Sequence, residues 1–256
     1  MKFIVIASNK DKAGMNIVNN LKELNCKIPI KIIDNDLIFN ENIDKSLDCD
    51  FIIFASKHEA KDQSKTLSIH TIGNFHEAKF GGKDATIVKS SALVFKHFFQ
   101  TLNKLNNSKY EVTMEATHHG PFVSKPCLFI EIGPSEVEWT DKDAGKVIAK
   151  TIIKSMQSFK KKDYKICFGV GGPHYCPNFN EIQLGDRYAI SHIAPSYSMP
   201  LDKELIQQVM DNTTEKLTTV LIDWKGFKSK ERNDILETLE GFDLEIVKTR
   251  DAKIHL

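Results

Sequence analysis

Short apolar runs alternate with helical patterns along most of this chain of 256 residues, and this alternation constrains the fold more than any other feature. Residues 51–55, 126–133 and 165–170 have the composition of buried strands, whereas residues 141–159 repeat apolar side chains at the spacing of a helix face. Buried strands that alternate with helices form layered α/β folds. We therefore predict an α/β fold with a mostly parallel or mixed sheet.

The same patterns extend over the rest of the chain. We expect further strands at residues 2–7, 67–72, 110–116, 188–193, 218–223 and 244–247, and further helices at 13–24, 90–105, 202–212 and 231–239. The polar loop 73–83 contains glycine and is able to cover a site, but it is too short to divide domains. Because no repeat, low-complexity tract or convincing linker interrupts the pattern, we predict a single domain spanning residues 1–256.

Composition narrows the class of protein and its compartment. Apolar residues make up 41% of the chain and charged residues 27%, and the net charge of +1 excludes a strongly basic coat for nucleic acid, though not a local basic patch. No stretch approaches the length of a membrane span, and the first strand turns polar at Ser8, so we expect no signal peptide. The five cysteines are odd in number and scattered, which indicates a reducing, cytoplasmic environment.

Two apolar runs end in polar clusters that a hydrophobic core does not require. His118 and His119 follow the run 110–114, and His174 follows the run 165–168, each on a backbone tightened by Gly and Pro. In open α/β sheets ligands bind outside the carboxyl ends of the strands. If the sheet is largely parallel, these segments share one rim, and we expect them to form one polar site able to hold a metal.

Other polar side chains also stand at predicted strand ends. His58 follows 51–55 and His70 lies within 67–72, so we assign His118, His174, His58 and His70 as candidate metal ligands. Each of them is alternatively a histidine satisfied locally. Neighbouring side chains on an extended chain point to opposite faces, so only one of His118 and His119 need enter the site, whereas both turn inward if Gly120-Pro121 breaks the strand. We assign His119 a catalytic role.

Carboxylates and loop amides complete the predicted site. Glu131 and Glu136 are candidate general bases or carboxylate ligands, although Glu136 is equally well explained as an acid in the first turn of a helix. We assign Gly171 and Gly172, whose amides are suited to an oxyanion, together with Lys57 and Asn74, to substrate binding. Two basic patches, 160–165 and 225–232, are typical of solvated faces, but either is able to hold a phosphate backbone.

Taken in order, several segments of the chain resemble the archaeal and plant type of D-aminoacyl-tRNA deacylase. The resemblance is carried by Ser56-Lys-His58-Glu59-Ala, His70-Thr-Ile-Gly73-Asn74, Glu115-Ala-Thr-His118-His119-Gly120-Pro121, Glu131-Ile-Gly133-Pro134-Ser135-Glu136-x-x-Trp139, Gly169-x-Gly171-Gly172-Pro173-His174-Tyr175 and Asp223-Trp224-Lys225-Gly226. It covers nearly the whole chain and weakens between residues 34 and 50 and beyond residue 229.

The resemblance implies a three-layer α/β/α sandwich around a mixed sheet, related to the peptidyl-tRNA hydrolases. It also implies hydrolysis of the ester that joins a D-amino acid to the 3′ end of tRNA, with zinc required. We accordingly expect a cytoplasmic, monomeric enzyme whose partner is D-aminoacyl-tRNA and which uses a metal-activated water. The alternatives are another hydrolase on the same scaffold, such as a peptidyl-tRNA hydrolase or a zinc amidohydrolase, and a non-catalytic RNA-binding protein.

Overall fold

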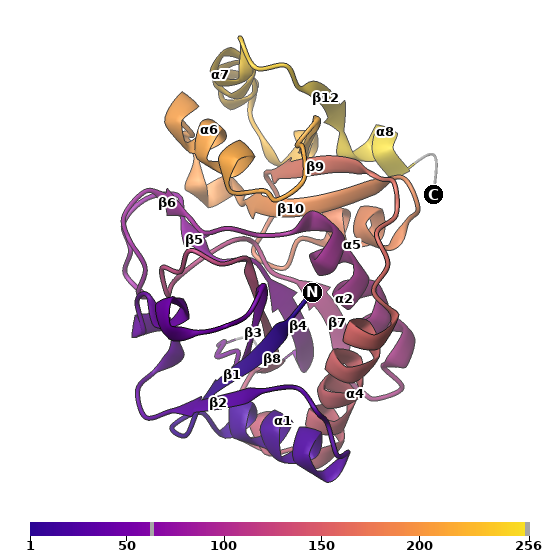
Figure 1. Ribbon diagram of the computed structural model, residues 1–256. Coiled ribbons are helices and arrows are strands. Elements are labelled where there is room, and N and C mark those ends of the chain that lie inside the picture. Colours follow the sequence, from indigo (N-terminus) through magenta and orange to yellow (C-terminus); the bar gives the residue numbers. More distant parts are fainter. Residues whose placement is uncertain (62–63, 254–256) are drawn as a thin grey trace.

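Two β-sheets divide the chain between them (Figure 1). The computed structural model describes residues 1–61 and 64–253. The first sheet has the strand order β2-β1-β3-β8-β4-β7, the second has the order β10-β9-β11-β12, and β5 pairs with β6. The strands are β1 (Phe3–Ser8), β2 (Ile30–Ile33), β3 (Phe51–Lys57), β4 (Thr66–His70), β5 (Gly73–Asn74), β6 (Thr86–Ile87), β7 (Glu111–Met114), β8 (Cys127–Gly133), β9 (Lys165–Val170), β10 (Tyr188–Ala194), β11 (Thr219–Ile222) and β12 (Glu245–Lys248).

Helices and short 3-10 turns cover these sheets. The helices are α1 (Lys12–Glu23), α2 (Ala92–Leu105), α3 (Glu136–Trp139), α4 (Lys142–Ser158), α5 (Pro177–Leu184), α6 (Lys203–Asp211), α7 (Ser229–Leu239) and α8 (Thr249–Lys253), and the 3-10 turns are η1 (Leu37–Phe39), η2 (Ile43–Ser46), η3 (Ser196–Ser198) and η4 (Trp224–Gly226). No helix among the described residues is long and apolar enough to cross a membrane.

The six-stranded sheet is mixed, and this decides where its strand ends lie. β2, β1, β3 and β8 run parallel, β4 runs antiparallel to β8, and β7 runs parallel to β4. The carboxyl ends of β4 and β7 therefore point away from those of β3 and β8. The strand ends of β4 and β7 therefore do not share a rim with those of β1, β3 and β8, and side chains that follow β4 and β7 meet those that follow β3 only over a face of the sheet.

The two faces of this sheet differ because side chains alternate along each strand. Leu128, Ile130 and Ile132 of β8 pack in the core shared with α1, α2 and α4. Phe129 packs on the opposite face, against η1 and the loop that contains Val123. Glu131 is two residues beyond Phe129, so it lies on the face away from the helices.

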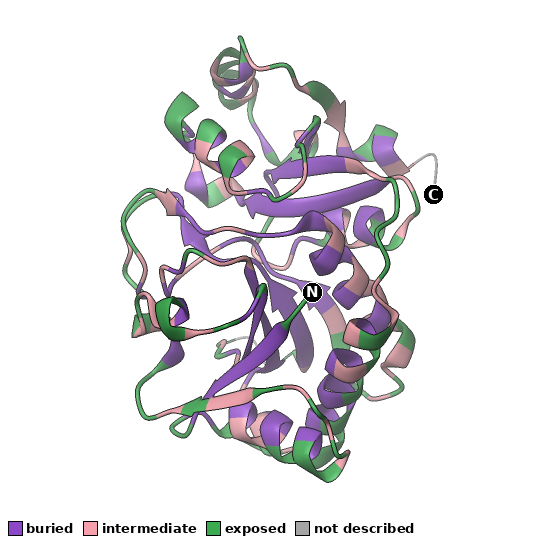
Figure 2. Cartoon of the chain, viewed as in Figure 1, coloured by how far each residue is buried: buried purple, intermediate pink, exposed green. Residues whose placement is uncertain are grey.

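The second sheet is fully parallel and is covered on both faces. Buried side chains of α2, α5 and α8 share one core with β9 and β10, and those of α6 and α7 pack on the other face. Since α2 also packs against α4, the first of these cores runs continuously from one sheet to the other. In Figure 2 the central strands of both sheets are buried, whereas the edge strands β2 and β12, the outer helix faces and the loops carry the intermediate and exposed residues.

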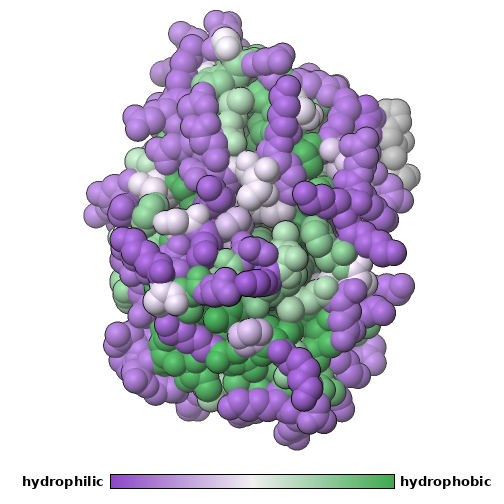
Figure 3. Space-filling view, viewed as in Figure 1, coloured by the Kyte–Doolittle hydropathy of each residue, from purple (hydrophilic) through white to green (hydrophobic). Residues whose placement is uncertain are grey.

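The predicted fold class, a mixed sheet flanked by helices, is confirmed. Two details differ from the expectation. The layer opposite α1, α2 and α4 consists of 3-10 turns and loops, and the C-terminal strands form a separate parallel sheet. Figure 3 shows hydrophilic residues over most of one face, in keeping with 35 basic and 34 acidic residues, with an apolar area in the lower part of the view.

Candidate active site

A cavity of about 760 Å³ opens where β1 and β3 end. Its size is that of a small-molecule site. Ser8, Ser56 and Lys57 line it from the ends of these two strands, and Phe80 lines it from the loop between β5 and β6. Among its other lining residues are polar side chains that the sequence assigned to the site, His58, His118, His119, Glu131 and His174. The convergence expected of strand-end histidines is therefore present, although it occurs on a face of the sheet.

Two buried carboxylates underlie these imidazoles. In the antiparallel register of β4 and β8, Ser68 pairs with Glu131 and His70 pairs with Phe129, so His70 and Glu131 share a face. Glu115 follows β7, and its amide donates to the Ile69 carbonyl, at 3.1 Å, which places it beside His70. Glu115 and Glu131 are 1% and 2% exposed, so neither carboxylate is solvated by bulk water.

Glu115 is the centre of the cluster. One of its carboxylate oxygens lies 2.9 Å from His174 Nε2 and 3.6 Å from His118 Nε2, and the other lies 3.2 Å from His58 Nδ1. Glu131 is more loosely surrounded, at 3.6 Å from His70 Nε2 and 3.8 Å from His58 Nδ1. Three histidines from three different segments thus meet a single buried carboxylate.

In each histidine of this cluster, one ring nitrogen, here called the outer nitrogen, has a polar partner outside the cluster. The cluster histidines are His58, His70, His118, His119 and His174. Three of the rings contact main-chain carbonyl oxygens through Nδ1, His70 with Thr71 at 3.1 Å, His118 with Ala116 at 2.8 Å and His119 with Gly120 at 2.6 Å. A carbonyl only accepts, so these nitrogens donate. In the neutral rings the other nitrogen, Nε2, carries the lone pair and is able to bind a metal.

Two tyrosine hydroxyls do the same for the remaining histidines. His58 Nε2 lies 2.8 Å from the Tyr175 hydroxyl, and His174 Nδ1 lies 3.0 Å from the Tyr197 hydroxyl. A hydroxyl is able to accept from either ring, which leaves His58 Nδ1 and His174 Nε2 facing Glu115. Partners of this kind on the outer nitrogen are typical of histidines that ligate metals.

The two carboxylates differ in acidity. Burial opposes ionisation of Glu115, but its contacts with His174 and His58 and the charge of His70 hold its pKa well below the usual range. For Glu131 burial dominates, so its pKa is raised despite the nearby His70. One buried carboxylate is therefore firmly ionised, while the other is displaced toward neutrality.

The histidines divide in the same way. Burial opposes protonation of His58, yet Glu115 and Glu131 together raise its pKa to about 9, and the same carboxylates raise the pKa of His70. Burial, together with the charge of His70, lowers the pKa of His119 to about 3 and holds that of His118 well below its usual range. The two carboxylates thus favour protonation of His58 and His70, whereas burial favours the neutral form of His118 and His119.

Three overlapping sets in the cluster have donor atoms within 4.8 Å of one another. These sets are His70, His118 and His119; His58, Glu115 and His174; and His70, Glu115 and Glu131. His70 Nε2 and Glu115 Oε1 are buried atoms without an aligned hydrogen bond among the described residues. Imidazole nitrogens and carboxylate oxygens are ligands that zinc accepts, so this set of donors fits such an ion.

Glu136, predicted as a catalytic acid or base, lies elsewhere. It begins α3, its side chain is 64% exposed, and it forms an ion pair with Lys12. It is absent from the lining of the cavity, so the structure does not bring it to the cluster. This arrangement corresponds to the alternative considered for Glu136, an acid in the first turn of a helix.

The predicted substrate-binding residues are scattered. Lys57 lines the cavity, with its ammonium 2.8 Å from Glu59 and 4.6 Å from the centre of the Trp139 ring. Asn74 instead donates to the Gly81 carbonyl, at 2.9 Å, and so braces the loop between β5 and β6. Asn74 does not line the cavity, and neither do Gly171 and Gly172 of the loop after β9.

Gly171 and Gly172 serve the second sheet. Their φ angles are +101° and +78°, a region that favours glycine. The Gly171 amide donates to the Ala194 carbonyl, at 2.7 Å, so it is not free for an oxyanion, and a Cβ at this position would lie 2.6 Å from the Phe227 ring. These glycines shape the loop that carries His174, and they do not face the cavity.

Sequence reasoning missed three residues of the cluster. Glu115 was noticed only within a motif, yet strand alternation separates Thr113 and Glu115 from the buried Met114 and Ala116 and would have placed it on the polar face. No local pattern pointed to Tyr175 or Tyr197 as histidine partners, since both depend on how the two sheets are joined.

A mixed α/β scaffold that gathers five histidines and two glutamates beneath one cavity defines the chain as an α/β enzyme. Comparison with known proteins specifies it further. The family model described as D-aminoacyl-tRNA deacylase matches residues 45–247. The chain belongs to the D-aminoacyl-tRNA deacylase family.

Individual relatives agree with this assignment. The D-aminoacyl-tRNA deacylase of Thermococcus onnurineus is 32% identical over 269 residues, which cover 96% of this chain and 99% of the relative. That of Methanocaldococcus jannaschii is 33% identical over 258 residues, covering 96% and 98%. A crystal structure of a conserved protein of unknown function superposes with a TM-score of 0.91 at 30% identity, covering 98% of this chain and 96% of that one.

Proposed function

We propose that this cavity is the active site at which the chain hydrolyses the ester between a D-amino acid and the 3′ end of tRNA. The family makes the chain a hydrolase of the D-aminoacyl-tRNA deacylase class. We choose this site because His58, His118 and His174 all meet the buried carboxylate of Glu115 there. The reaction releases a D-amino acid and free tRNA, and the tRNA is then available again for translation.

The proposed cofactor is zinc, held by imidazoles of His118, His174, His58 and His70 with Glu115 beside them. Its support is the donor set itself and the buried His70 Nε2, which lacks an aligned hydrogen bond among the described residues. When bound, such an ion supplies a Lewis acid that makes water a nucleophile near neutral pH and polarises a carbonyl. The firmly ionised Glu115 would balance the charge of the ion.

The chain's own side chains supply the remaining steps. Glu131 lines the cavity with a raised pKa, so its carboxylate is suited to accept a proton and return it to the leaving ribose oxygen. His119, neutral and on the cavity wall, is suited to orient the acyl group. At the rim, Lys10 and Lys57 offer charge for the terminal phosphates of tRNA, and the exposed Phe80 offers a ring for the terminal base.

We further propose that the enzyme acts as a monomer in the cytoplasm. The cluster supplies its donor atoms within one chain, so the proposed chemistry needs no residue from a second copy. Aminoacyl-tRNA is a substrate of the translating compartment, and the five cysteines have free thiols, which suits a reducing one.

The decisive experiment compares matched D- and L-aminoacyl-tRNA and a peptidyl-tRNA, each with and without a chelator. We expect rapid hydrolysis of the D-aminoacyl ester, slow hydrolysis of the other two, and loss of activity in chelator that zinc restores. Equal rates on D and L esters would refute the proposed specificity. Faster cleavage of peptidyl-tRNA would favour the alternative hydrolase, and tight binding without hydrolysis would favour an RNA-binding protein.

A further inference from the structure

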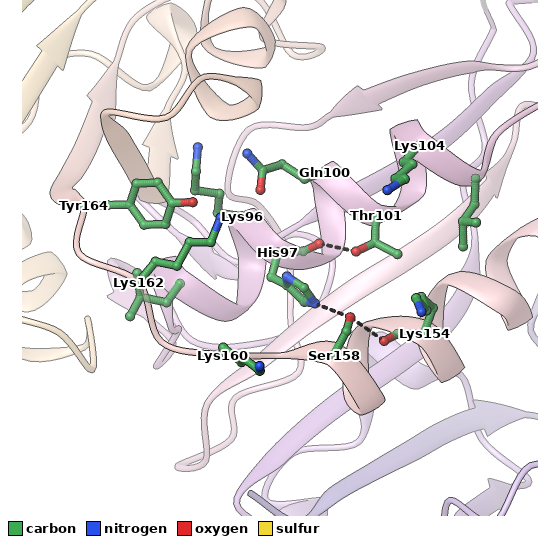
Figure 4. Close-up of a pocket in the computed structure, with 12 residues that line it drawn as sticks. Lys96, His97, Gln100, Thr101, Lys104, Lys154, Ser158, Lys160, Lys162 and Tyr164 are labelled. Atoms are coloured by element: carbon green, nitrogen blue, oxygen red, sulfur yellow. Dashed lines mark hydrogen bonds between the residues drawn. The ribbon is translucent and has the colours of Figure 1, made fainter.

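A second concave feature lies between α2 and α4, on the helix side of the six-stranded sheet (Figure 4). This groove has a volume of about 410 Å³. α2 supplies Lys96 and Lys104, the end of α4 supplies Lys154, and the connection to β9 supplies Lys160 and Lys162. The basic run 160–165, singled out in the sequence, thus lies along one wall of a groove.

The charge of the groove is of one sign. Its twelve lining residues include five lysines and no carboxylate, in a chain whose basic and acidic residues nearly balance. Lys104, Lys154, Lys160 and Lys162 are exposed, and within residues 1–61 and 64–253 none of these four forms an ion pair. Asp163 lies within the run 160–165 but does not line the groove.

The fifth lysine forms the floor. Lys96 is 1% exposed, and its ammonium donates to the carbonyls of Gln183 and Gly185 at 2.6 and 2.5 Å. Its ammonium also lies 4.7 Å from the centre of the Tyr164 ring. These two carbonyls lie at the C-terminal end of α5, where a cation is favourable, so they offset part of the cost of burying this charge, and the other four lysines supply the exposed charge of the groove. Burial and the like charge of Lys162 lower the pKa of Lys96 to about 8, although Asp186 opposes this.

The groove is also braced. His97 Nε2 lies 3.2 Å from the Ser158 hydroxyl, which donates to the Lys154 carbonyl at 2.8 Å, so α2 and α4 are tied together beneath the lysines (Figure 4). A positively charged surface held by packed helices needs little rearrangement to receive a polyanion.

We propose that this groove binds phosphate groups of an RNA backbone and is a second contact for tRNA, remote from the ester being hydrolysed. The identity of the RNA rests on the proposed function. The groove belongs to the helix layer, whereas Glu131 and the histidines occupy the opposite face of the sheet. Its lysines therefore contribute to affinity for the whole tRNA and take no part in the chemistry.

The test uses the full chain and uncharged tRNA, so that binding is measured without catalysis. The groove variant replaces Lys104, Lys154, Lys160 and Lys162 with Gln, and a control with equal loss of charge replaces Lys216, Lys225, Lys228 and Lys230, which includes the second basic patch. Each phosphate contact contributes about 1 to the slope of log affinity against log salt. We expect the slope to fall by about 2–4 in the groove variant and to change little in the control, with matching melting temperatures.

A short ester, D-aminoacyl-adenosine, provides the second readout because it reaches only the cavity. We expect the groove variant to hydrolyse it at the wild-type rate. If the slope of log tRNA affinity against log salt were unchanged in the groove variant, the inference would be overturned, even if that variant no longer bound an acidic polypeptide. An equal fall in this slope in the groove variant and the control would overturn it too. If wild-type protein bound tRNA through the groove but hydrolysed no D-aminoacyl ester, the proposed function would fail and this inference would stand.

Discussion

At the residue scale, Glu115 and Glu131 lie on one face of the same sheet, yet their pKa values are displaced in opposite directions. The difference comes from their neighbours, since Glu115 meets His174 at 2.9 Å, whereas the nearest histidine to Glu131 among the described residues is 3.6 Å away. Carboxylates whose environments separate their acidities commonly take different catalytic roles. We assign Glu115 to charge balance at the metal and Glu131 to proton transfer.

Replacing Glu115 with Gln should reduce turnover of D-aminoacyl-tRNA by about 10²–10³, the usual effect of removing one positioned electrostatic contact. It should also lower the zinc content of protein purified without chelator, measured by elemental analysis. Glu136→Gln is the matched control, because Glu136 is exposed and outside the cavity. If Glu136→Gln lost activity and Glu115→Gln kept it, the result would contradict the role of Glu115 in the site and the placement of Glu136 outside it.

The pKa of His58 gives the metal-free protein a defined response to pH. This pKa is about 9 in the folded chain, against 6.5 for an unperturbed histidine. Protonation of His58 therefore stabilises the fold fully below pH 6.5, and the contribution is lost as pH rises to about 9, with an upper limit of about 3 kcal/mol.

In chelator, urea unfolding should thus give a smaller free energy of unfolding at pH 9 than at pH 6.5. The His58→Gln variant, measured in parallel, should lack that part of the decline. Identical pH profiles for the two proteins would show that His58 is not paired with Glu115 as described.

At the scale of elements, the chain's periodicity predicted most of what forms. The helix expected at 141–159 is α4 (Lys142–Ser158), and the strand expected at 165–170 is β9 (Lys165–Val170). β2 (Ile30–Ile33), a half-buried edge strand, and α5 (Pro177–Leu184), a short helix after a Gly- and Pro-rich loop, lack the long patterns on which prediction relies.

The direction of β4 was not predictable from the sequence, and it determines which side chains meet in the site. The apolar residues of β4 are equally compatible with a parallel or an antiparallel strand, so nothing local indicated that His70 would face Glu131 across an antiparallel pair. The histidines were identified from their positions after strands, whereas the central role of Glu115 depends on register and could not be ranked from the sequence.

The segments around the second sheet contribute ring partners as well as His174, a proposed zinc ligand. Tyr175 follows β9 and Tyr197 lies in η3, and each hydroxyl contacts the outer nitrogen of a cluster histidine. Tyr175→Phe and Tyr197→Phe should each weaken zinc affinity by about 10- to 100-fold, the usual effect of losing such a partner. Competition with a fluorescent chelator measures this affinity without an activity assay.

Tyr164→Phe is the matched control, since Tyr164 lies in the distant groove. Unchanged zinc affinity in both test variants would mean that the hydroxyls do not position His58 and His174.

At the scale of the whole molecule, one continuous core joins the two sheets through α2, and the site lies where loops from both meet. Glu115 and His118 follow β7 of the six-stranded sheet, and His174 follows β9 of the four-stranded sheet. The site is therefore complete only when the two sheets are packed together. In a chain whose charges nearly balance, apolar packing holds them in place.

The most direct test of the account is a zinc titration of chelator-treated protein, with bound metal and the rate of D-aminoacyl-tRNA hydrolysis measured in the same samples. We predict that the rate rises in proportion to occupancy and that His174→Ala binds zinc weakly and stays inactive across the titration. Full activity without zinc, or full occupancy by zinc without activity, would contradict the claim that this histidine–glutamate cluster is a zinc-dependent catalytic centre.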